Sequence, residues 1–273
     1  MIRKIIRGLL LLICLGSLGY IGYQYNWLNV RSNVTRYQTT HQVAKLSHSK
    51  VSQGTRQRIE RQIMRQTQSD QDLTKQGFVS IPNVGILQPI FNDAYSDKGL
   101  AAGANYANRS AVDPDGKTVP VMGQGNYGLA SHNFNDGKTG FSALQDKLNE
   151  DAPYLVNGKL KGSNWLKGKM LYLANDKGIY AYKIGRQTLV NEDDVSVLNP
   201  TKKPVVTIIS CLFPSTQYRI ITNAKLTKTY TWQKAPAKVV NLFDLEKQNT
   251  NVHASWFNPG TEEGANGDAG GSK

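Results

Sequence analysis

The residue best suited to covalent chemistry is Cys211, which ends the apolar, β-branched run PVVTIISC and precedes LFPSTQ, a segment with turn-forming residues. A cysteine is nucleophilic only as a thiolate, so it needs a proton acceptor or a positive charge nearby. The end of a core strand beside a loop is a position that a substrate can reach. Cys211 is therefore a candidate nucleophile, and a buried, inert cysteine is the alternative.

Two other side chains could complete such a site. Of the four histidines, only His132 lies in a strand-like run, GNYGLASHNF, whereas the others lie in a polar segment or near the C-terminus. Arg219 follows Cys211 by eight residues, so a short hairpin would bring it close to the end of the cysteine's strand. An arginine there can hold a thiolate, orient a carbonyl or stabilise an oxyanion. A structural histidine and a solvated strand arginine are the alternatives.

The sequence has no pattern typical of a metal or phosphate site. It contains no paired-cysteine spacing and no His-x-x-x-His, and its acidic residues are scattered. The glycine-rich segment at residues 123–128 precedes a strand pattern, unlike a phosphate-binding loop. Cys14 lies in an apolar N-terminal run, so a disulfide with Cys211 is not expected. We expect no required metal or cofactor, and no nucleic-acid partner because no recognised motif is present.

The positions of these residues depend on a series of short β-branched and aromatic runs that begins after Gly77. The runs predict eight or nine strands, at residues 78–84, 86–91, 127–134, 169–176, 179–190, 204–213, 218–226, 230–233 and 239–243. Such a series is typical of an all-β sandwich or barrel. Short helices are expected in the connections, at residues 142–149 and 193–198.

An apolar run precedes these strands. From Ile5 to Tyr23 the chain carries one charge, Arg7, and is about long enough to cross a bilayer. Four aromatic residues between positions 20 and 27 resemble an interface belt, which favours an uncleaved anchor over a cleaved signal peptide. The basic residues before the run favour a cytoplasmic N-terminus, although the basic stretch after it opposes this orientation.

We expect four segments along the chain. Residues 1–29 form a cytoplasmic tip and membrane helix, and residues 30–76 form a polar, partly helical, extracytoplasmic stalk. Residues 77–257 form the β-domain, and the tail at 258–273 is too poor in apolar residues to fold. The formal charge of +13 is concentrated near the membrane, where it favours contact with anionic lipids and wall polymers.

Three motifs resemble those of a known family, the sortases. GNYGLASHNF around His132, TIISC ending at Cys211 and YRI around Arg219 resemble the family's histidine, TLxTC and arginine motifs. SIPNVGILQPIF at residues 80–91 resembles the first strands of the sortase barrel. The three motifs stand in the family's order and spacing, which is more specific than any single motif.

The sequence departs from the family's usual motifs at three positions. Ile208 and Ser210 stand where Leu and Thr are usual, and Ser131 stands where Gly is frequent before the histidine. These conservative differences are expected to affect fine substrate preference rather than activity. An N-terminal anchor without a second apolar helix after the barrel resembles the class A, or housekeeping, members. Calcium assists some members, and no acidic cluster here predicts a calcium requirement.

The resemblance implies an eight-stranded barrel and transpeptidation of surface proteins that carry an LPxTG-type sorting signal. Cys211 would attack the Thr carbonyl to give a thioester, with His132 as acid and base and Arg219 stabilising the oxyanion. An amine of the cell-wall precursor lipid II, or of peptidoglycan, would then resolve the thioester. The family's substrate-groove positions correspond to Ala130, Thr207 and Ile209.

Two other cysteine enzymes and one non-enzymatic role are alternatives. An L,D-transpeptidase has its histidine and cysteine close together in an SHGC-like motif, whereas here they are 79 residues apart. A papain-like protease places the cysteine before the histidine, the reverse of this order. A membrane-tethered β-domain that only binds wall polymer or a partner would keep Cys211 buried and unreactive.

Overall fold

The computed structural model of the chain describes residues 2–25, 27–47, 50–65, 72–134, 136–145 and 154–251. The predicted disordered tail at residues 258–273 lies outside these ranges, as does the second half of the helix predicted at 142–149.

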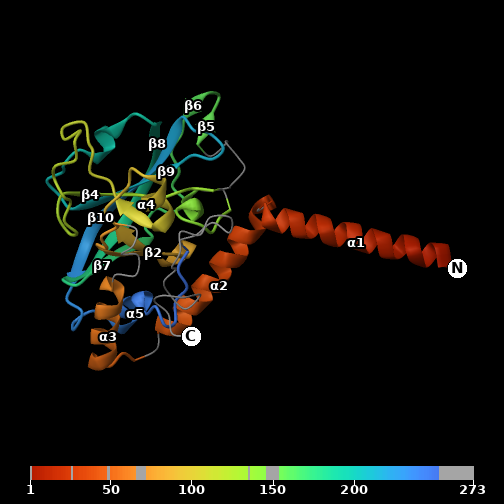
Figure 1. Ribbon diagram of the computed structural model, residues 1–273, viewed down its shortest axis with the longest axis horizontal. Coiled ribbons are helices and arrows are strands. Elements are labelled where there is room, and N and C mark those ends of the chain that lie inside the picture. Colours follow the sequence, from red (N-terminus) through yellow and green to blue (C-terminus); the bar gives the residue numbers. More distant parts are fainter. Residues whose placement is uncertain are drawn as a thin grey trace.

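The centre of the molecule is a closed barrel of eight strands (Figure 1). The strands are β1 (Gly77–Ile81), β2 (Ile86–Phe91), β3 (Ala104–Tyr106), β4 (Asn126–Ala130), β7 (Met170–Asn175), β8 (Gly178–Asn191), β9 (Val205–Cys211) and β10 (Tyr218–Tyr230). Around the barrel they follow the order β1, β2, β3, β4, β9, β10, β8, β7, and β7 closes onto β1. The predicted eight-stranded barrel is confirmed.

Two of the eight neighbouring strand pairs are parallel. β2 pairs in parallel with β3, and β4 with β9, whereas the other six pairs are antiparallel. Parallel neighbours require a long crossover connection. Between β4 and β9 this crossover contains β7, β8 and a small hairpin formed by β5 (Leu155–Val156) and β6 (Lys159–Leu160). The crossover returns the chain beside β4 in the same direction, which brings the segment after β4 next to the end of β9.

Apolar side chains fill the barrel because successive residues of a strand point to opposite faces. Val206 and Ile208 of β9, Leu129 of β4, and Tyr182 and Ile184 of β8 lie in one buried cluster, each at most 2% exposed. The intervening residues of these strands therefore face outward. This alternation decides which side chains of β9 are available on the outer surface.

Short helices lie between the strands and after the last strand, β10, and 3-10 helices are labelled η. They are η3 (Pro82–Val84), α4 (Asp97–Ala102), η4 (Ser142–Leu144), η5 (Val195–Leu198), α5 (Ala237–Val240) and η6 (Asn241–Phe243). The helical turn predicted near residues 193–198 is found as η5. The strands predicted at 230–233 and 239–243 are wrong. β10 ends at Tyr230 and a turn follows it, whereas residues 239–243 lie in α5 and η6 and bury Val239, Val240 and Phe243 in one cluster with Ile59 and Ile63. A short apolar run fits a buried helical turn as well as a strand.

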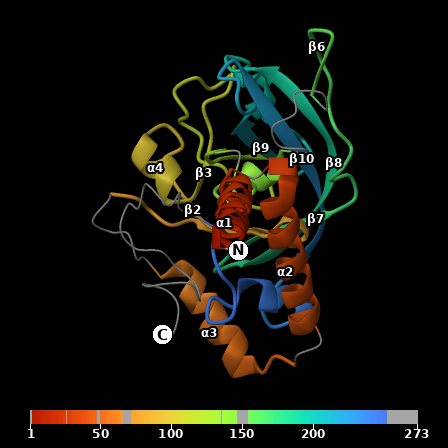
Figure 2. The same cartoon turned by 90° about the vertical axis from the view of Figure 1, so that its right-hand side faces the viewer.

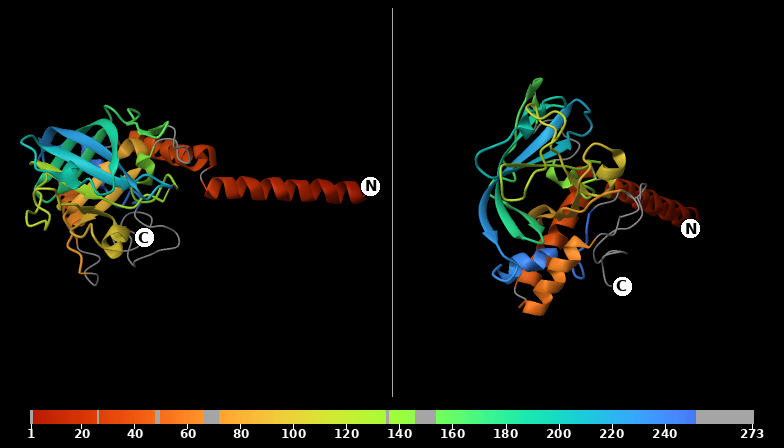
Figure 3. Two further views of the ribbon diagram at one scale, coloured as in Figure 1. Left: turned by 90° about the horizontal axis from the view of Figure 1, so that it is seen from above. Right: turned by 60° about the vertical axis from the view of Figure 1, so that its left-hand side comes forward.

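In the described part of the chain, three α-helices precede the barrel: α1 (Ile2–Gln24), α2 (Val30–Ser47) and α3 (Gln53–Met64), and the 3-10 helix η1 (Trp27–Asn29) lies between the first two. Helix α1 projects away from the rest of the molecule (Figures 1 and 3). Among the described residues it is the one helix long and apolar enough to cross a membrane, and none of its residues is buried. Leu28 has a φ of 54°, outside the helical region, so the chain changes direction between α1 and α2.

Helix α3 packs below the barrel beside α5 (Figure 2). Ile59 and Ile63, one helical turn apart, are both fully buried. They share a cluster with Phe78 of β1 and with Trp232 and Phe243 after β10. Although α3 lies in the segment predicted as a stalk, its apolar face is part of the globular core.

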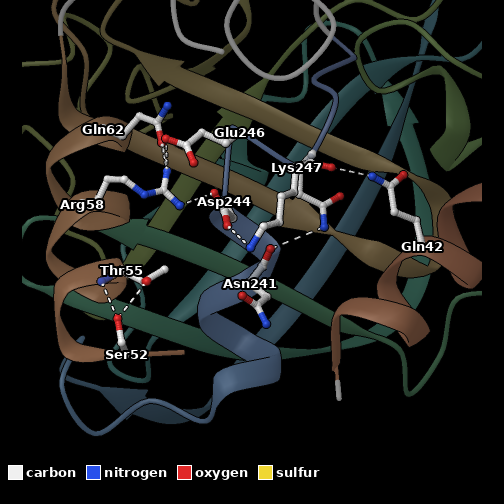
Figure 4. Close-up of polar contacts among 10 residues, drawn as sticks. Gln42, Ser52, Thr55, Arg58, Gln62, Asn241, Asp244, Glu246 and Lys247 are labelled. Atoms are coloured by element: carbon white, nitrogen blue, oxygen red, sulfur yellow. Dashed lines mark hydrogen bonds and ion pairs between the residues drawn. The ribbon is translucent and has the colours of Figure 1, made fainter. Parts of the chain in front are cut away.

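Hydrogen bonds and ion pairs connect α3 to residues 244–247, which directly follow η6 (Figure 4). Arg58 contacts Asp244 at 2.8 Å and Glu246 at 2.7 Å, and the Asp244 side chain is fully buried. Lys247 also contacts Asp244, at 3.1 Å. From α2, Gln42 Nε2 donates a 2.6 Å hydrogen bond to the carbonyl of Lys247. A buried carboxylate needs such partners, so this cluster links α2, α3 and the segment after the barrel.

We predict that Ile63→Ala destabilises the fold by about 2–5 kcal/mol, because it removes apolar contacts and leaves a cavity between α3 and the barrel. Urea denaturation in detergent, followed by tryptophan fluorescence, measures the effect. Gln57→Ala on the exposed face of the same helix is the matched control and should change stability by less than about 0.5 kcal/mol. Equal stability of the two variants would show that α3 does not pack as described.

Candidate active site

The end of β9 brings together two of the predicted site residues. In the antiparallel pair of β9 and β10, Cys211 and Arg219 are direct partners. Partners across adjacent strands point to the same face of the sheet, with Cβ atoms about 4.5–5.5 Å apart. The short connection at residues 212–217 thus places Arg219 directly opposite Cys211 on the neighbouring strand, as the spacing of eight residues predicts.

His132 approaches the cysteine from the other side of β9. Ala130 at the end of β4 is the partner of Ile209, and the two strands run in parallel. His132 lies two residues after Ala130, and Cys211 lies two residues after Ile209. The parallel register therefore places His132 and Cys211 at the same height along the two strands. β4 ends at Ala130, and His132 lies in the loop that follows rather than within the predicted strand. The Asn133 side chain confirms the proximity of this loop, since its Nδ2 donates a 2.8 Å hydrogen bond to the Cys211 carbonyl.

The site lies on the outer face of the barrel. Because Val206 and Ile208 point inward, the alternating residues Thr207, Ile209 and Cys211 face outward. Cys211 is partly exposed. A thiol in this position is accessible from the surface, which argues against the alternative of a fully buried, inert cysteine.

Several contacts hold the Arg219 side chain. Its Nη1 donates hydrogen bonds to the carbonyl of Thr216 in the connection at 2.7 Å and to that of Tyr218, the first residue of β10, at 3.2 Å. Its Nη2 donates to the Glu192 carboxylate at 3.1 Å, and the Arg219 side chain is 24% exposed. Glu192 lies just after β8, the other neighbour of β10, and its backbone N–H bonds to the Gln217 carbonyl at 2.9 Å. The arginine is thus a partly buried positive charge with a defined direction.

His132 is partly buried, with its ring centroid 4.8 Å from that of Phe134. Burial lowers the pKa of His132 below its ordinary 6.5, because an imidazolium would lose hydration, and the nearby charge of Asp97 opposes this effect. The imidazole is therefore mainly neutral at pH 7. A neutral imidazole can accept a proton from a thiol or an amine.

The three predicted substrate-groove positions lie on the same outer face. Ala130 and Ile209 are partners on β4 and β9, and both are partly exposed. Thr207 is only 1% exposed, and its Oγ1 lies 2.7 Å from Asn126 Oδ1 and 3.0 Å from Asn223 Oδ1, so the single hydroxyl hydrogen is shared between these two acceptors. The Thr207 hydroxyl is therefore used within the sheet, whereas Ala130 and Ile209 present apolar surface next to Cys211.

Sequence reasoning missed three polar residues around the site: Asn133, Gln145 and Glu192. Asn133 adjoins the histidine motif, so its position alone could have indicated it. Gln145 and Glu192 come from other parts of the chain, and nothing in their local sequence points to the site. Among the residues that the structure describes, no group of three or more His, Cys, Asp or Glu side chains could hold a metal ion.

Comparison with protein families and curated proteins gives consistent matches. The model of the sortase domain matches residues 79–227, which is more than half of the chain. The chain is 28% identical to Sortase A of Streptococcus agalactiae over 177 residues, 64% of this chain and 62% of that protein. It is also 28% identical to Sortase A of Listeria monocytogenes over 154 residues, 56% of this chain and 57% of that protein. The chain thus spans less than two thirds of the length of these relatives.

Solved sortases are also found among similar structures. Sortase A of Listeria monocytogenes gives a TM-score of 0.46 at 24% identity, covering 61% of this chain and 94% of that one. Sortase C of Streptococcus pneumoniae gives a TM-score of 0.42 at 20% identity, covering 57% and 68%.

We predict that His132 titrates with a midpoint below 6.5, as expected from its burial. NMR of histidine-labelled protein measures the midpoint, and His132→Gln assigns the signal by removing it. Between the folded-state pKa and 6.5 the unfolded chain binds more protons than the folded chain, so stability should fall as the pH drops through this window. A midpoint at or above 6.5 would contradict the burial described for the ring.

Proposed function

The chain belongs to the sortase family, and from this premise we propose that it is a cysteine transpeptidase that cleaves LPxTG-type sorting signals between Thr and Gly. The observation that carries the proposal is the register that sets Arg219 opposite Cys211 on one side and brings the His132 loop level with Cys211 on the other. The matched relatives named Sortase A support class A, the housekeeping group.

In the first half-reaction, neutral His132 takes the proton of the Cys211 thiol. The sulfur then attacks the Thr carbonyl carbon, forming a C–S bond and a tetrahedral oxyanion. Arg219, a permanently charged donor, stabilises that oxygen. Collapse of the intermediate breaks the Thr–Gly C–N bond, and protonated His132 gives its proton to the departing amine. The product is a thioester between Cys211 and the surface protein.

In the second half-reaction, an amine of lipid II or of peptidoglycan attacks the thioester carbonyl. His132 accepts a proton from this amine, and the thiolate of Cys211 leaves as the new amide bond forms. The thiolate then recovers a proton, which returns the enzyme to its starting state. One histidine therefore serves both halves, as a base for each nucleophile and an acid for each leaving group.

The sorting signal would lie across the outer face of β4 and β9. Ala130 and Ile209 would contact the apolar residues of the signal, because both are partly exposed and lie beside the end of β9. Thr207 would support this surface from below, since its hydroxyl is bonded to Asn126 and Asn223. We propose no required metal or cofactor for these steps.

Helix α1 would anchor the enzyme in the cell membrane by a single span, with the N-terminus in the cytoplasm and the barrel outside. Residues 1–29 would form the tip and anchor, 30–76 the connection and 77–257 the catalytic domain. The surface protein and lipid II are both held at the outer membrane face. Confinement of all three components at one surface raises their effective concentrations.

We predict that Cys211→Ala abolishes cleavage of an LPxTG peptide and formation of the thioester, followed by mass spectrometry with a glycine-type amine as acceptor. His132→Ala should remove most of the activity because both proton transfers are lost. Arg219→Ala should lower kcat by about 10²–10³-fold, the usual effect of removing an oxyanion donor.

Two matched variants control this experiment. Cys14→Ser removes the other cysteine, and Arg186→Ala removes an exposed arginine of β8. Both should retain wild-type activity. Absence of cleavage and of thioester with any sorting peptide in the wild-type chain would refute the transpeptidase and favour a wall-binding domain.

The proposed orientation of α1 predicts that the barrel is accessible from outside intact cells. In a Cys211→Ala background, Lys203→Cys places a thiol at an exposed turn before β9. A membrane-impermeant maleimide should label this residue in intact cells. Labelling only after lysis would place the barrel in the cytoplasm and contradict the proposed topology.

A further inference from the structure

The backbone pairing that aligns His132 with Cys211 stops before it reaches either residue. The parallel pairing of β4 and β9 ends at Ala130 and Ile209, two residues short of both. A loop residue beyond the last pair is free to move relative to the neighbouring strand unless other contacts hold it. The structure has such contacts, and they are made by two side-chain amides.

Asn133 makes the first link. Its Nδ2 donates one hydrogen bond to the Cys211 carbonyl at 2.8 Å and another to Gln145 Oε1 at 2.7 Å. Asn133 is only 7% exposed, so these bonds are shielded from water. Because Asn133 directly follows His132, the bond to Cys211 ties the backbone of one reacting residue to that of the other.

Gln145 makes the second link, from the connection after η4. Its Nε2 donates to the Phe213 carbonyl at 2.8 Å, and its Oε1 accepts from the Phe213 N–H at 3.0 Å. The amide thus pairs with both backbone groups of Phe213, as a neighbouring strand would. Gln145 is 3% exposed. The bond between the two amides joins the histidine loop to the chain that follows Cys211.

A backbone hydrogen bond also joins the two ends of the loop that carries His132, so the bond from Asn133 to Cys211 restricts the position of both ends. The Phe141 N–H donates a 2.7 Å hydrogen bond to the His132 carbonyl. Gly140 has a φ of 59°, and a Cβ at this position would lie 2.4 Å from the same carbonyl oxygen. Only glycine fits this close approach. The opposite side of the cysteine segment is fixed by the Leu212 N–H, which bonds to the Tyr218 carbonyl at 3.0 Å.

We propose that Asn133 and Gln145 are positioning residues that continue the β4–β9 pairing through their side chains and so hold His132 at the distance from Cys211 that proton transfer requires. This inference rests on the proposed transpeptidase function. Neither residue would touch the substrate. Their loss should affect the chemical steps and leave binding of the sorting signal nearly unchanged, because Ala130 and Ile209 lie within the ladder that remains.

The test compares Asn133→Ala, Gln145→Met and the double variant with the wild-type chain. Gln145→Met keeps the approximate volume and removes the polar atoms, so the chain should still fold. Gln248→Met is the matched control, since Gln248 is also buried but its amide bonds to the Asn241 carbonyl, away from the site. For each of the two residues we expect kcat for peptide cleavage to fall about tenfold to a hundredfold, with KM within about twofold. The kcat of the double variant should be only slightly below that of the less active single variant, because the two amides act as one unit.

A second measurement does not depend on catalysis. Loosening the loop should admit water to the His132 ring, so the NMR titration midpoint of His132 should rise toward 6.5 in both variants and stay unchanged in Gln248→Met. Folded variants with wild-type kcat and an unchanged midpoint would overturn the inference. If wild-type protein forms no thioester, the proposed function fails, and the His132 midpoint alone then decides whether the amides position the ring.

Discussion

The site depends on the position of β9 between two partners of opposite direction. β10 returns antiparallel after a short connection, so residues near the turn face each other and Arg219 meets Cys211. β4 runs parallel to β9, and their pairing ends at Ala130 and Ile209. His132 and Cys211 each follow this last pair by two residues, so they lie at the same height along the two strands. A one-residue slip in either register would turn the partner side chain to the opposite face of the sheet. The inward packing of Val206 and Ile208 prevents such a slip, because it would expose these side chains and bury polar ones.

The alternation of inward- and outward-facing residues along β9 assigns core packing and the candidate site to different side chains. Inward residues of β9 fill the barrel, and outward residues form the site, so neither set must serve both purposes. Thr207 lies between the two roles: it faces outward but is buried, and its hydroxyl is bonded to Asn126 and Asn223. It thereby links β4, β9 and β10 at the base of the candidate groove. The three strands that carry the site are thus joined by side chains as well as by backbone pairing.

Much of this arrangement could be predicted from the sequence because it follows local patterns. β-branched runs indicated seven of the eight barrel strands, and the spacing of Cys211 and Arg219 indicated their hairpin. Features that depend on tertiary contacts were missed. β3 has only three residues, too few for a periodic pattern. The run at 239–243 is apolar without a clear period, and its burial against Ile59 and Ile63 of α3 favours helical turns. Gln145, which directly follows η4, joins the site through tertiary hydrogen bonds between its side-chain amide and the backbone of Phe213.

The contacts of Arg219 meet two requirements of its proposed role as an oxyanion donor, which are a fixed direction and free N–H donors. A guanidinium has five N–H groups. Among the described residues, two of them bond to the carbonyls of Thr216 and Tyr218 and one to Glu192, which leaves two for a substrate oxygen. The carbonyl contacts come from the turn and from the first residue of β10, and they fix the side chain. The Glu192 side chain is 53% exposed, and such an ion pair is worth at most about 1 kcal/mol. Glu192 can therefore orient the Arg219 side chain without holding it strongly, and the proposed role of Arg219 requires this ion pair to give way to a negative charge.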